Sequence, residues 1–389
     1  MTTDTPRVVP IGAARSVLKV RARQAARDRT AVMLLLPVAT LLIVGLGAVL
    51  SSSSVVAIRE GVDQWFYFKR QIIWVMVGVG ALLVTVRISY RWYARMATAI
   101  FVIAVFGLLA TLLIGDVRGG SRRWIELGPM TIQASEFAKF AQVAFLAAVL
   151  TRKEAYLGRF AHFFWPVAGS LTIIGTLLVM EPDLGTAVLI TATSFAVLVA
   201  STAPLRFVLG LGMLGALIGS VMAYARPYRR ARITAFLDPS SDPLGAGLQP
   251  IQSLVALGTG GWFGVGLGAS RARWSFLPNA HTDFIFAIIG EEVGFAGAIV
   301  VVALFALFAI TGLAIAYRAP DQFGRLLGVG IVAWLSIQAL INIGGVAVVL
   351  PITGVPLPFV SSGGSAMVAN LAAVGVLVNI ARTPTEDSE

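Results

Sequence analysis

A series of apolar stretches, most about as long as a membrane-spanning helix, constrains this chain more than any other sequence feature. A helix needs about 20 apolar residues to cross roughly 30 Å of hydrocarbon. The stretches with few or no charges are Thr30–Ala57, Gln71–Val86, Met96–Gly115, Phe137–Thr151, Phe160–Met180, Leu184–Leu205, Phe207–Ala225, Phe284–Tyr317 and Leu326–Ala381. The last stretch is too long for one crossing, and its prolines divide it into two helices. The sequence therefore predicts an all-α polytopic membrane protein, a bundle of ten transmembrane helices.

The composition excludes several classes of protein. Charged residues make up 13% of the chain, whereas a soluble domain has roughly 25%. The chain has no cysteine and only two histidines, far apart in sequence, so neither a disulfide framework nor a Cys or His metal cluster is expected. The net charge of +11 is better explained by membrane topology or an anionic substrate than by nucleic acid, and we expect no nucleic-acid partner.

The basic residues indicate how the chain is oriented. Residues 1–29 form a basic segment, which we expect to be a disordered cytoplasmic tail because positive charge favours the inner side of the membrane. Ten crossings place residues 383–389, the C-terminal tail, on the same side. The membrane domain then spans residues 30–382, and the connection between helices seven and eight, residues 226–283, is a large extracytoplasmic loop. Loops of that length are usually functional or disordered.

The most specific motif surrounds Asp283, where residues 277–286 read LPNAHTDFIF. The apolar run after Asp283 begins a spanning helix, so we expect this carboxyl, with His281 and Thr282 before it, at the outer surface of the membrane. Partial loss of water there would raise its pKa from about 3.9 toward the range that a general base needs. An Asp at a helix N-terminus can also cap the helix. The two roles are compatible, and spacing alone does not choose between them.

Two outer loops carry cations that are unusual for that side of a membrane. The first loop contains Arg123 and Trp124, and the second contains Arg229 and Arg232. Arginine forks suit a diphosphate, and tryptophan suits a sugar face or the headgroup belt. The alternative is that these residues only anchor the loops at the interface or lie on an amphipathic stretch.

Several polar residues interrupt the apolar segments. Glu136 and Lys139 are three residues apart on one face of a helix, either as an ion pair or with Lys139 turned toward an anionic headgroup. Glu291 and Glu292 lie two turns into the eighth span, where they indicate a polar cavity or an interhelical contact. The last apolar block is broken around Ser361, and such a break suits the wall of a polar pocket.

Taken together, these segments resemble the SEDS family (shape, elongation, division and sporulation), the polytopic peptidoglycan glycosyltransferases that include FtsW and RodA. The resemblance covers about residues 30 to 382. It is carried by AHTDFIF at 280–286, GEE at 290–292, PLPF at 356–359, GGS at 363–365, RWI at 123–125, SE at 135–136 with Lys139, PDLGT at 182–186 and QSL at 252–254. The segment IIGEE at 288–292 and the basic tail are more similar to FtsW than to RodA. The departures from the usual pattern are Ala134, Glu181, Leu248 and Ser362, where Pro, Gln, Tyr and an aromatic residue are usual.

The resemblance implies that the chain polymerises lipid II, a disaccharide-pentapeptide on undecaprenyl diphosphate, at the outer face of the cytoplasmic membrane. Asp283 would accept the proton of the acceptor hydroxyl as general base, with inversion at the donor carbon. Cations would stabilise the leaving diphosphate, so no second acid is needed. The residues expected to contact or orient substrate are Arg123, Trp124, Glu136, Lys139, Arg229, Arg232, Gln252, Ser253, His281, Thr282, Ser361 and Gly363.

The family also implies partners and a location. We expect a class B penicillin-binding protein that crosslinks the new glycan, other division proteins, membrane lipid, and a position at the division septum. No cofactor is expected beyond a divalent cation, Mg²⁺ or Mn²⁺, that would assist the diphosphate. The alternatives are a lipid II flippase, a polymerase of the RodA elongation type, and a catalytically inert division scaffold.

Overall fold

The computed structural model describes residues 11–118, 121–128, 130–225, 227–272 and 281–383. Within these ranges nine helices are long and apolar enough to cross a membrane, and a tenth apolar helix has 17 residues. The ten are α1 (Ile11–Arg59), α2 (Phe66–Arg87), α3 (Tyr90–Ile114), α4 (Ala134–Arg152), α5 (Phe160–Met180), α6 (Leu184–Ala200), α7 (Leu205–Tyr224), α10 (Ile285–Tyr317), α11 (Gln322–Val346) and α12 (Gly364–Arg382). The predicted all-α polytopic fold is confirmed.

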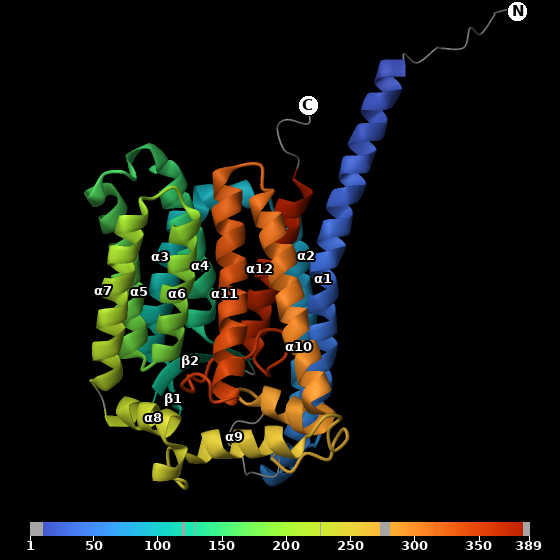
Figure 1. Ribbon diagram of the computed structural model, residues 1–389, viewed down its shortest axis with the longest axis vertical. Helices are drawn as coiled ribbons and strands as arrows, with labels where there is room; N and C mark the ends of the chain where they lie inside the picture. The colour runs from blue at the N-terminus through green and yellow to red at the C-terminus, as the bar shows by residue number, and fades with distance from the viewer. Residues whose placement is uncertain (1–10, 119–120, 129, 226, 273–280, 384–389) are drawn as a thin grey trace, which may run out of the picture.

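The ten helices stand side by side (Figure 1), and three of them are much more buried than the others. In α4, α11 and α12 the most apolar window is 72%, 67% and 72% buried, whereas in α7 it is 6% buried. Helix α11 packs against α4, α6 and α10, while α12 packs closely against α2. The buried helices therefore form the core, and α7 lies at the periphery with its apolar side chains outward.

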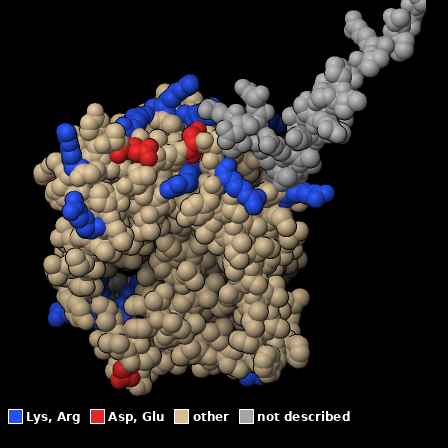
Figure 2. Space-filling model, turned by 45° about the horizontal axis from the view of Figure 1, so that its top comes forward, with Lys and Arg blue, Asp and Glu red and all other residues tan. Residues whose placement is uncertain are grey.

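The two ends of the bundle differ in structure and charge. One end, which we call the loop end, carries a three-stranded antiparallel sheet and two short helices, α8 (Pro227–Leu237) and α9 (Leu248–Thr259) (Figure 1). The other, the basic end, is where α12 finishes and where α1 passes out of the bundle. Lys and Arg side chains gather around the basic end, and the wall below it has very little charge (Figure 2). The basic end includes Arg87, Arg91, Arg95, Arg152, Lys153, Arg159, Arg206, Arg318, Arg325 and Arg382.

Two parts of the chain differ from the prediction. The segment expected to be a disordered tail is helical from Ile11, so α1 runs far beyond the membrane span. Residues 11–29 are rich in Ala and Arg, which are good helix formers, and proline is absent from them. The first outer loop, which contains Arg123 and Trp124, forms three strands: β1 (Asp116–Arg118), β2 (Ser121–Leu127) and β3 (Met130–Ile132). β1 and β3 have three residues each, and the seven residues of β2 do not alternate between polar and apolar side chains.

Helix α10 is broken near its start. Gly294 has φ 78° and ψ −171°, so Ile285–Tyr317 is really a short helix followed by a long one. Glu291 and Glu292 lie in the short piece, before the break. The Glu291 carboxylate accepts hydrogen bonds from the Ser270 hydroxyl and from the N–H of Arg271 and Ala272. Glu291 therefore makes a structural contact, mainly with the segment after α9 rather than with a neighbouring helix.

Candidate functional site

Asp283 lies at the loop end, directly before α10, and its backbone is held by residues from the last break in the bundle. The Asn342 amide on α11 donates to the Asp283 carbonyl at 2.8 Å. The Ser361 hydroxyl donates to the carbonyl of Thr282 at 2.6 Å, and the N–H of Ser362 donates to the carbonyl of His281 at 3.0 Å. Three successive carbonyls are thus fixed, so the direction of the Asp283 side chain is set by α11 and by the segment before α12.

The segment of residues 351–359, which we call the proline loop, forms one side of this site. Gly354 has φ +76°, and a Cβ atom placed on it would lie 3.5 Å from Oδ2 of Asp283. The carboxylate therefore faces backbone here. The Asn342 amide also donates to the Val355 carbonyl at 2.9 Å, and the Gln338 amide donates to the Pro356 carbonyl at 2.8 Å. Two amide side chains, one turn apart on α11, hold the loop in place.

The environment of Asp283 changes the acidity of its carboxyl. Loss of water raises the pKa of Asp283 to about 6, against the opposing effects of Arg232, Arg123 and a hydrogen bond from Thr282. The negative charge of Asp183 also raises the pKa of Asp283. Phe284, not Asp283, is the N-cap of α10, and no side chain caps that helix. The capping alternative is therefore not what the structure shows, whereas a carboxyl with a raised pKa fits a general base.

Arg123 is held against the turn between α5 and α6. Its Nε lies 3.4 Å from the Glu181 carbonyl, another guanidinium nitrogen donates to the Pro182 carbonyl, and Nη1 lies 3.8 Å from Oδ1 of Asp183. Asp183 in turn caps α6 by accepting from the N–H and hydroxyl of Thr186. This turn therefore fixes the position of the Arg123 guanidinium, whose positive charge lowers the pKa of Asp283.

Glu181 is the least expected group of this turn. Its side chain is fully buried, and neither carboxylate oxygen has a hydrogen-bond partner among the described residues. Burial raises the pKa of Glu181 to about 8, and the nearby charge of Asp183 adds to the shift, while Arg123 opposes it. Glu181 is therefore protonated and neutral near pH 7.

Lys139 and Glu136 lie inside the bundle. Lys139 Nζ is 2.7 Å from Oε2 of Glu136 and 2.9 Å from Oε1 of Gln338, and it lies over the Trp334 ring at 5.2 Å from its centroid. Both charged residues are 2% exposed. The structure thus places the pair among protein groups rather than at a surface. Because Gln338 also binds Pro356, the pair supports the proline loop.

The predicted residues of the long loop divide into two groups. Arg232 on α8 is half-buried, donates to the Ile352 carbonyl at 3.2 Å and, with Gln249, lines a cavity of ≈ 20 Å³. Arg229 donates to the carbonyl of Met222, at the end of α7. Ser253 is buried and donates to the carbonyls of Pro250 and Val346, which fastens α9 to the end of α11. Among Arg229, Arg232 and Ser253, Arg232 is the residue whose hydrogen bond reaches the proline loop, beside Asp283.

The remaining predicted residues surround the site less closely. The His281 ring packs on Tyr67 at 5.4 Å between centroids, and burial lowers the pKa of His281. Trp124 pairs with Asp116 in the sheet, Gly363 is the N-cap of α12, and Gln252 is half-buried on α9. The first four residues of the LPNAHTDFIF motif, 277–280, lie outside the described ranges. No group of three or more His, Asp or Glu side chains in the described part of the chain is placed to hold a metal ion.

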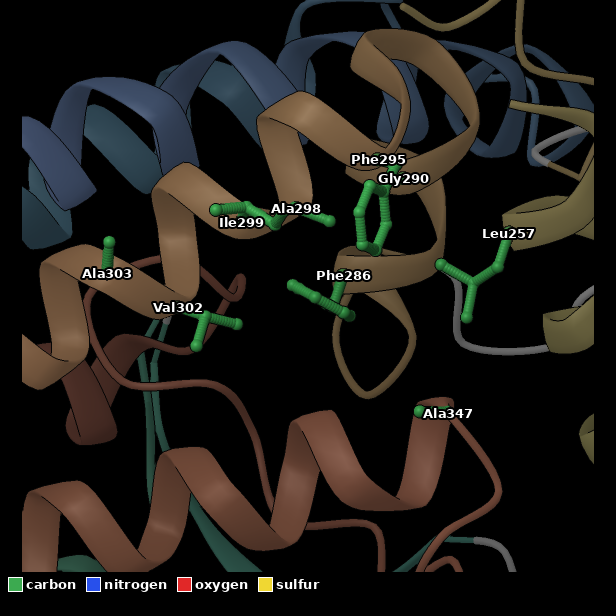
Figure 3. A pocket seen from close by; sticks show the side chains of 9 residues that line it. All are labelled: Leu257, Phe286, Gly290, Phe295, Ala298, Ile299, Val302, Ala303 and Ala347. Carbon is green, nitrogen blue, oxygen red and sulfur yellow. The ribbon is translucent and has the colours of Figure 1, made fainter. Parts of the chain in front are cut away.

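The larger cavity, of ≈ 380 Å³, lies beside the site and is apolar (Figure 3). It is formed by α9, by both pieces of α10 and by the residue after α11. Its lining residues are Leu257, Phe286, Gly290, Phe295, Ala298, Ile299, Val302, Ala303 and Ala347. Asp283 lines neither this cavity nor the one beside Arg232. The site is therefore a polar cluster at the loop end with an apolar cavity next to it.

Three groups that hold the site are not among the residues predicted from sequence: Asn342, Gln338 and Glu181. The signal for the first two is present, because they are polar residues four apart in an otherwise apolar span, which places them on one face of a helix. Glu181 is visible in the sequence as a departure from the family pattern, but its burial is not.

Comparison with known proteins identifies the class of this protein. The family model for FtsW, RodA and SpoVE, described as "Cell cycle protein", matches residues 31–386, and the chain belongs to this SEDS family. It is 40% identical over 359 residues to "Stage V sporulation protein E" of Bacillus subtilis, covering 91% of this chain and 98% of that protein. It is 39% identical over 350 residues to "Probable peptidoglycan glycosyltransferase FtsW" of Trichlorobacter lovleyi, covering 90% and 92%.

Solved structures agree with this assignment. The chain superimposes with a TM-score of 0.71 and 28% identity on a chain of the structure titled "Structural coordination of polymerization and crosslinking by a peptidoglycan synthase complex", covering 90% of this chain and 96% of that one. The rod shape determining protein RodA of Thermus thermophilus gives a TM-score of 0.66 at 25% identity, covering 90% and 95%. The protein is thus a multi-pass membrane protein of this family.

Proposed function

We propose that this protein polymerises lipid II into glycan strands, with Asp283 as the general base. As a SEDS-family member the chain is a peptidoglycan glycosyltransferase. The observation that supports the proposal is Asp283 itself: hydrogen bonds to the carbonyls of residues 281, 282 and 283 hold its backbone, and its carboxyl has a pKa raised to about 6. At pH 7 a group with this pKa is ~90% deprotonated, yet it is more basic than an ordinary Asp.

The proposed reaction has one proton transfer and one displacement. Asp283 takes the proton of the acceptor sugar hydroxyl, and the oxygen attacks the anomeric carbon of the donor as its bond to the diphosphate breaks. Attack from the side opposite the leaving group inverts that carbon. The positive charges of Arg232 and Arg123 lie near Asp283 and lower its pKa. We propose that Arg232 stabilises the departing diphosphate. Three contacts hold Arg123 at the turn of residues 181–183. We therefore propose that its guanidinium acts through its positive charge from a fixed position.

The loop end is proposed to face the outside of the cytoplasmic membrane, with both termini inside. The basic side chains around the opposite end support this orientation. A transpeptidase of the class B penicillin-binding type is the proposed partner, since the related solved structure is titled as a complex for polymerisation and crosslinking. Septal synthesis is the proposed role. Sporulation and elongation are the competing roles, because proteins named for each are among the relatives.

Purified protein in detergent provides the test, because detergent leaves no membrane to cross. A polymerase incubated with lipid II in detergent produces glycan chains, whereas a lipid II flippase or an inert scaffold produces none. We expect polymer that a muramidase digests. Purified wild-type protein that binds lipid II and remains folded but yields no polymer, both alone and with its transpeptidase, would contradict the proposal. A fluorescent fusion at midcell, rather than along the side wall, tests the septal role.

A further inference from the structure

The segment of residues 261–268, which follows α9 and which we call the aromatic loop, exposes large apolar side chains. Trp262, Phe263 and Leu267 are 69%, 85% and 84% exposed. The surrounding chain from Ile251 to Ser270 contains no charged residue. Exposed apolar patches of this kind mark a surface that contacts protein or membrane rather than water.

The aromatic loop is fixed by backbone hydrogen bonds to the break in α10. The N–H of Val265 donates to the Glu291 carbonyl at 2.9 Å, and that of Gly266 donates to the Glu292 carbonyl at 3.1 Å. In the other direction, the N–H of Phe295 donates to the carbonyl of Gly261 at 2.8 Å. The loop thus satisfies backbone groups that the break at Gly294 releases, which irregular backbone needs in an apolar environment.

Two facing glycines make this pairing possible. Gly264 has φ +77°, and a Cβ atom there would lie 2.1 Å from the Glu292 carbonyl oxygen. Gly294 has φ +78°, and a Cβ atom there would lie 2.3 Å from the N atom of Gly264. With no side chain between the two backbones, the large side chains of the loop are left on its outer surface.

The exposed side chains of the loop continue the outer surface of a spanning helix. The Trp262 ring meets the Phe295 ring edge-on, with centroids 5.3 Å apart. Phe295 is 52% exposed, and Ile299 and Val302, which follow it at helical spacing on α10, are 49% and 45% exposed. These α10 residues also border the larger cavity (Figure 3). In Figure 1 the loop lies beside the lower end of α10, beyond the end of α9.

We propose that the aromatic loop is a membrane anchor whose Trp262, Phe263 and Leu267 insert among the lipid chains of the leaflet at the loop end. Its surface is continuous with the lipid-facing side of α10, and the absence of charge from 251 to 270 suits a lipid environment. Tryptophan is enriched where protein meets the membrane interface. Anchored in this way, the loop holds the α10 break, and with it the start of the helix after Asp283, at a fixed depth. The inference does not depend on the proposed reaction.

Single-cysteine labelling tests the anchor directly, because the chain contains no cysteine. Phe263→Cys and Leu267→Cys carry an environment-sensitive fluorophore, and the full-length protein is placed in phosphatidylglycerol–phosphatidylethanolamine vesicles. Leu244→Cys is the matched control, since Leu244 is 90% exposed on the same long loop but distant in sequence from the α10 break. We expect blue-shifted emission at 263 and 267, quenched by nitroxide lipids and protected from iodide. The label at 244 is expected to show no blue shift, to be quenched by iodide and not to be quenched by nitroxide lipids.

Two outcomes would overturn the proposal. Labels at 263 and 267 that iodide quenches as strongly as the label at 244 would place the loop in water. Labels protected from both iodide and nitroxide lipids would show that protein covers the loop. If that protection disappears when the protein is diluted into excess lipid, the covering surface is a second copy of this chain.

Discussion

Replacing Asn342 with Leu tests how the structure positions Asp283. Asn342 is 5% exposed, and its side-chain amide donates to the carbonyls of Asp283 and Val355 at 2.8 and 2.9 Å. Leucine is close to asparagine in size and has no donor, so both carbonyls lose a partner. Each unsatisfied buried group costs about 1–3 kcal/mol. Because the half-buried Asp283 carbonyl can accept a water molecule instead, we expect the variant to lose roughly 2–4 kcal/mol of stability.

The effect on activity follows from geometry. A catalytic group displaced by about 1 Å loses up to ~100-fold in rate, so we expect kcat of Asn342→Leu on lipid II to fall by roughly 10- to 100-fold. Asn379→Leu is the matched control, because Asn379 also makes two hydrogen bonds, to the Val86 carbonyl and the Tyr90 N–H, but at the basic end. The Asn379→Leu variant should have a lower melting temperature than wild type and the same kcat. Equal kcat values for the two variants, measured at saturating lipid II, would refute the reasoning.

Two further predictions concern the acids of the site. The rate at saturating lipid II should rise roughly tenfold per pH unit below a midpoint of about 6, because Asp283 acts only when deprotonated; a flat profile from about pH 5 to 7 would contradict this. Glu181 keeps its proton in the folded protein up to about pH 8 but ionises earlier in the unfolded chain, so its contribution to stability is lost as pH rises between about 4.5 and 8. Glu181→Gln cannot ionise, and its melting temperature should improve relative to wild type as pH rises from 5 to 8. A difference in melting temperature between Glu181→Gln and wild type that is the same at pH 5 and pH 8 would contradict the raised pKa of Glu181.

The sequence predicts the membrane fold well, since nine apolar stretches, the last long enough for two helices, leave few other arrangements. It does not predict the break in α10. The apolar run continues through Gly294, and the positive φ there depends on pairing with Gly264, 30 positions earlier in the chain. Hydropathy reports which segments are apolar and carries no information about such long-range backbone contacts. The strands at the loop end are missed because β1 and β3 have only three residues each and β2 has no alternating apolar pattern.

The candidate site is predicted in part. Asp283 is recognisable from its motif, but which face of a helix a residue occupies is decided by packing. Lys139 and Glu136 match the family pattern, yet both point into the bundle and support the proline loop through Gln338. Ser361 is predicted to contact substrate, and in the structure its hydroxyl donates to the Thr282 carbonyl. Sequence therefore identifies the polar residues near the site without separating the reacting group from its supports.

Polymerisation of lipid II by purified Asp283→Asn tests the central claim most directly. Asparagine preserves size and the backbone contacts of residue 283 but cannot accept the proton, and general-base catalysis contributes about 10²–10⁴-fold. The control is Asp63→Asn, which alters an exposed carboxylate between α1 and α2. We predict that Asp283→Asn keeps its fold and loses polymer synthesis by at least about 100-fold, while Asp63→Asn retains it. Near-normal glycan synthesis by folded Asp283→Asn would contradict the account.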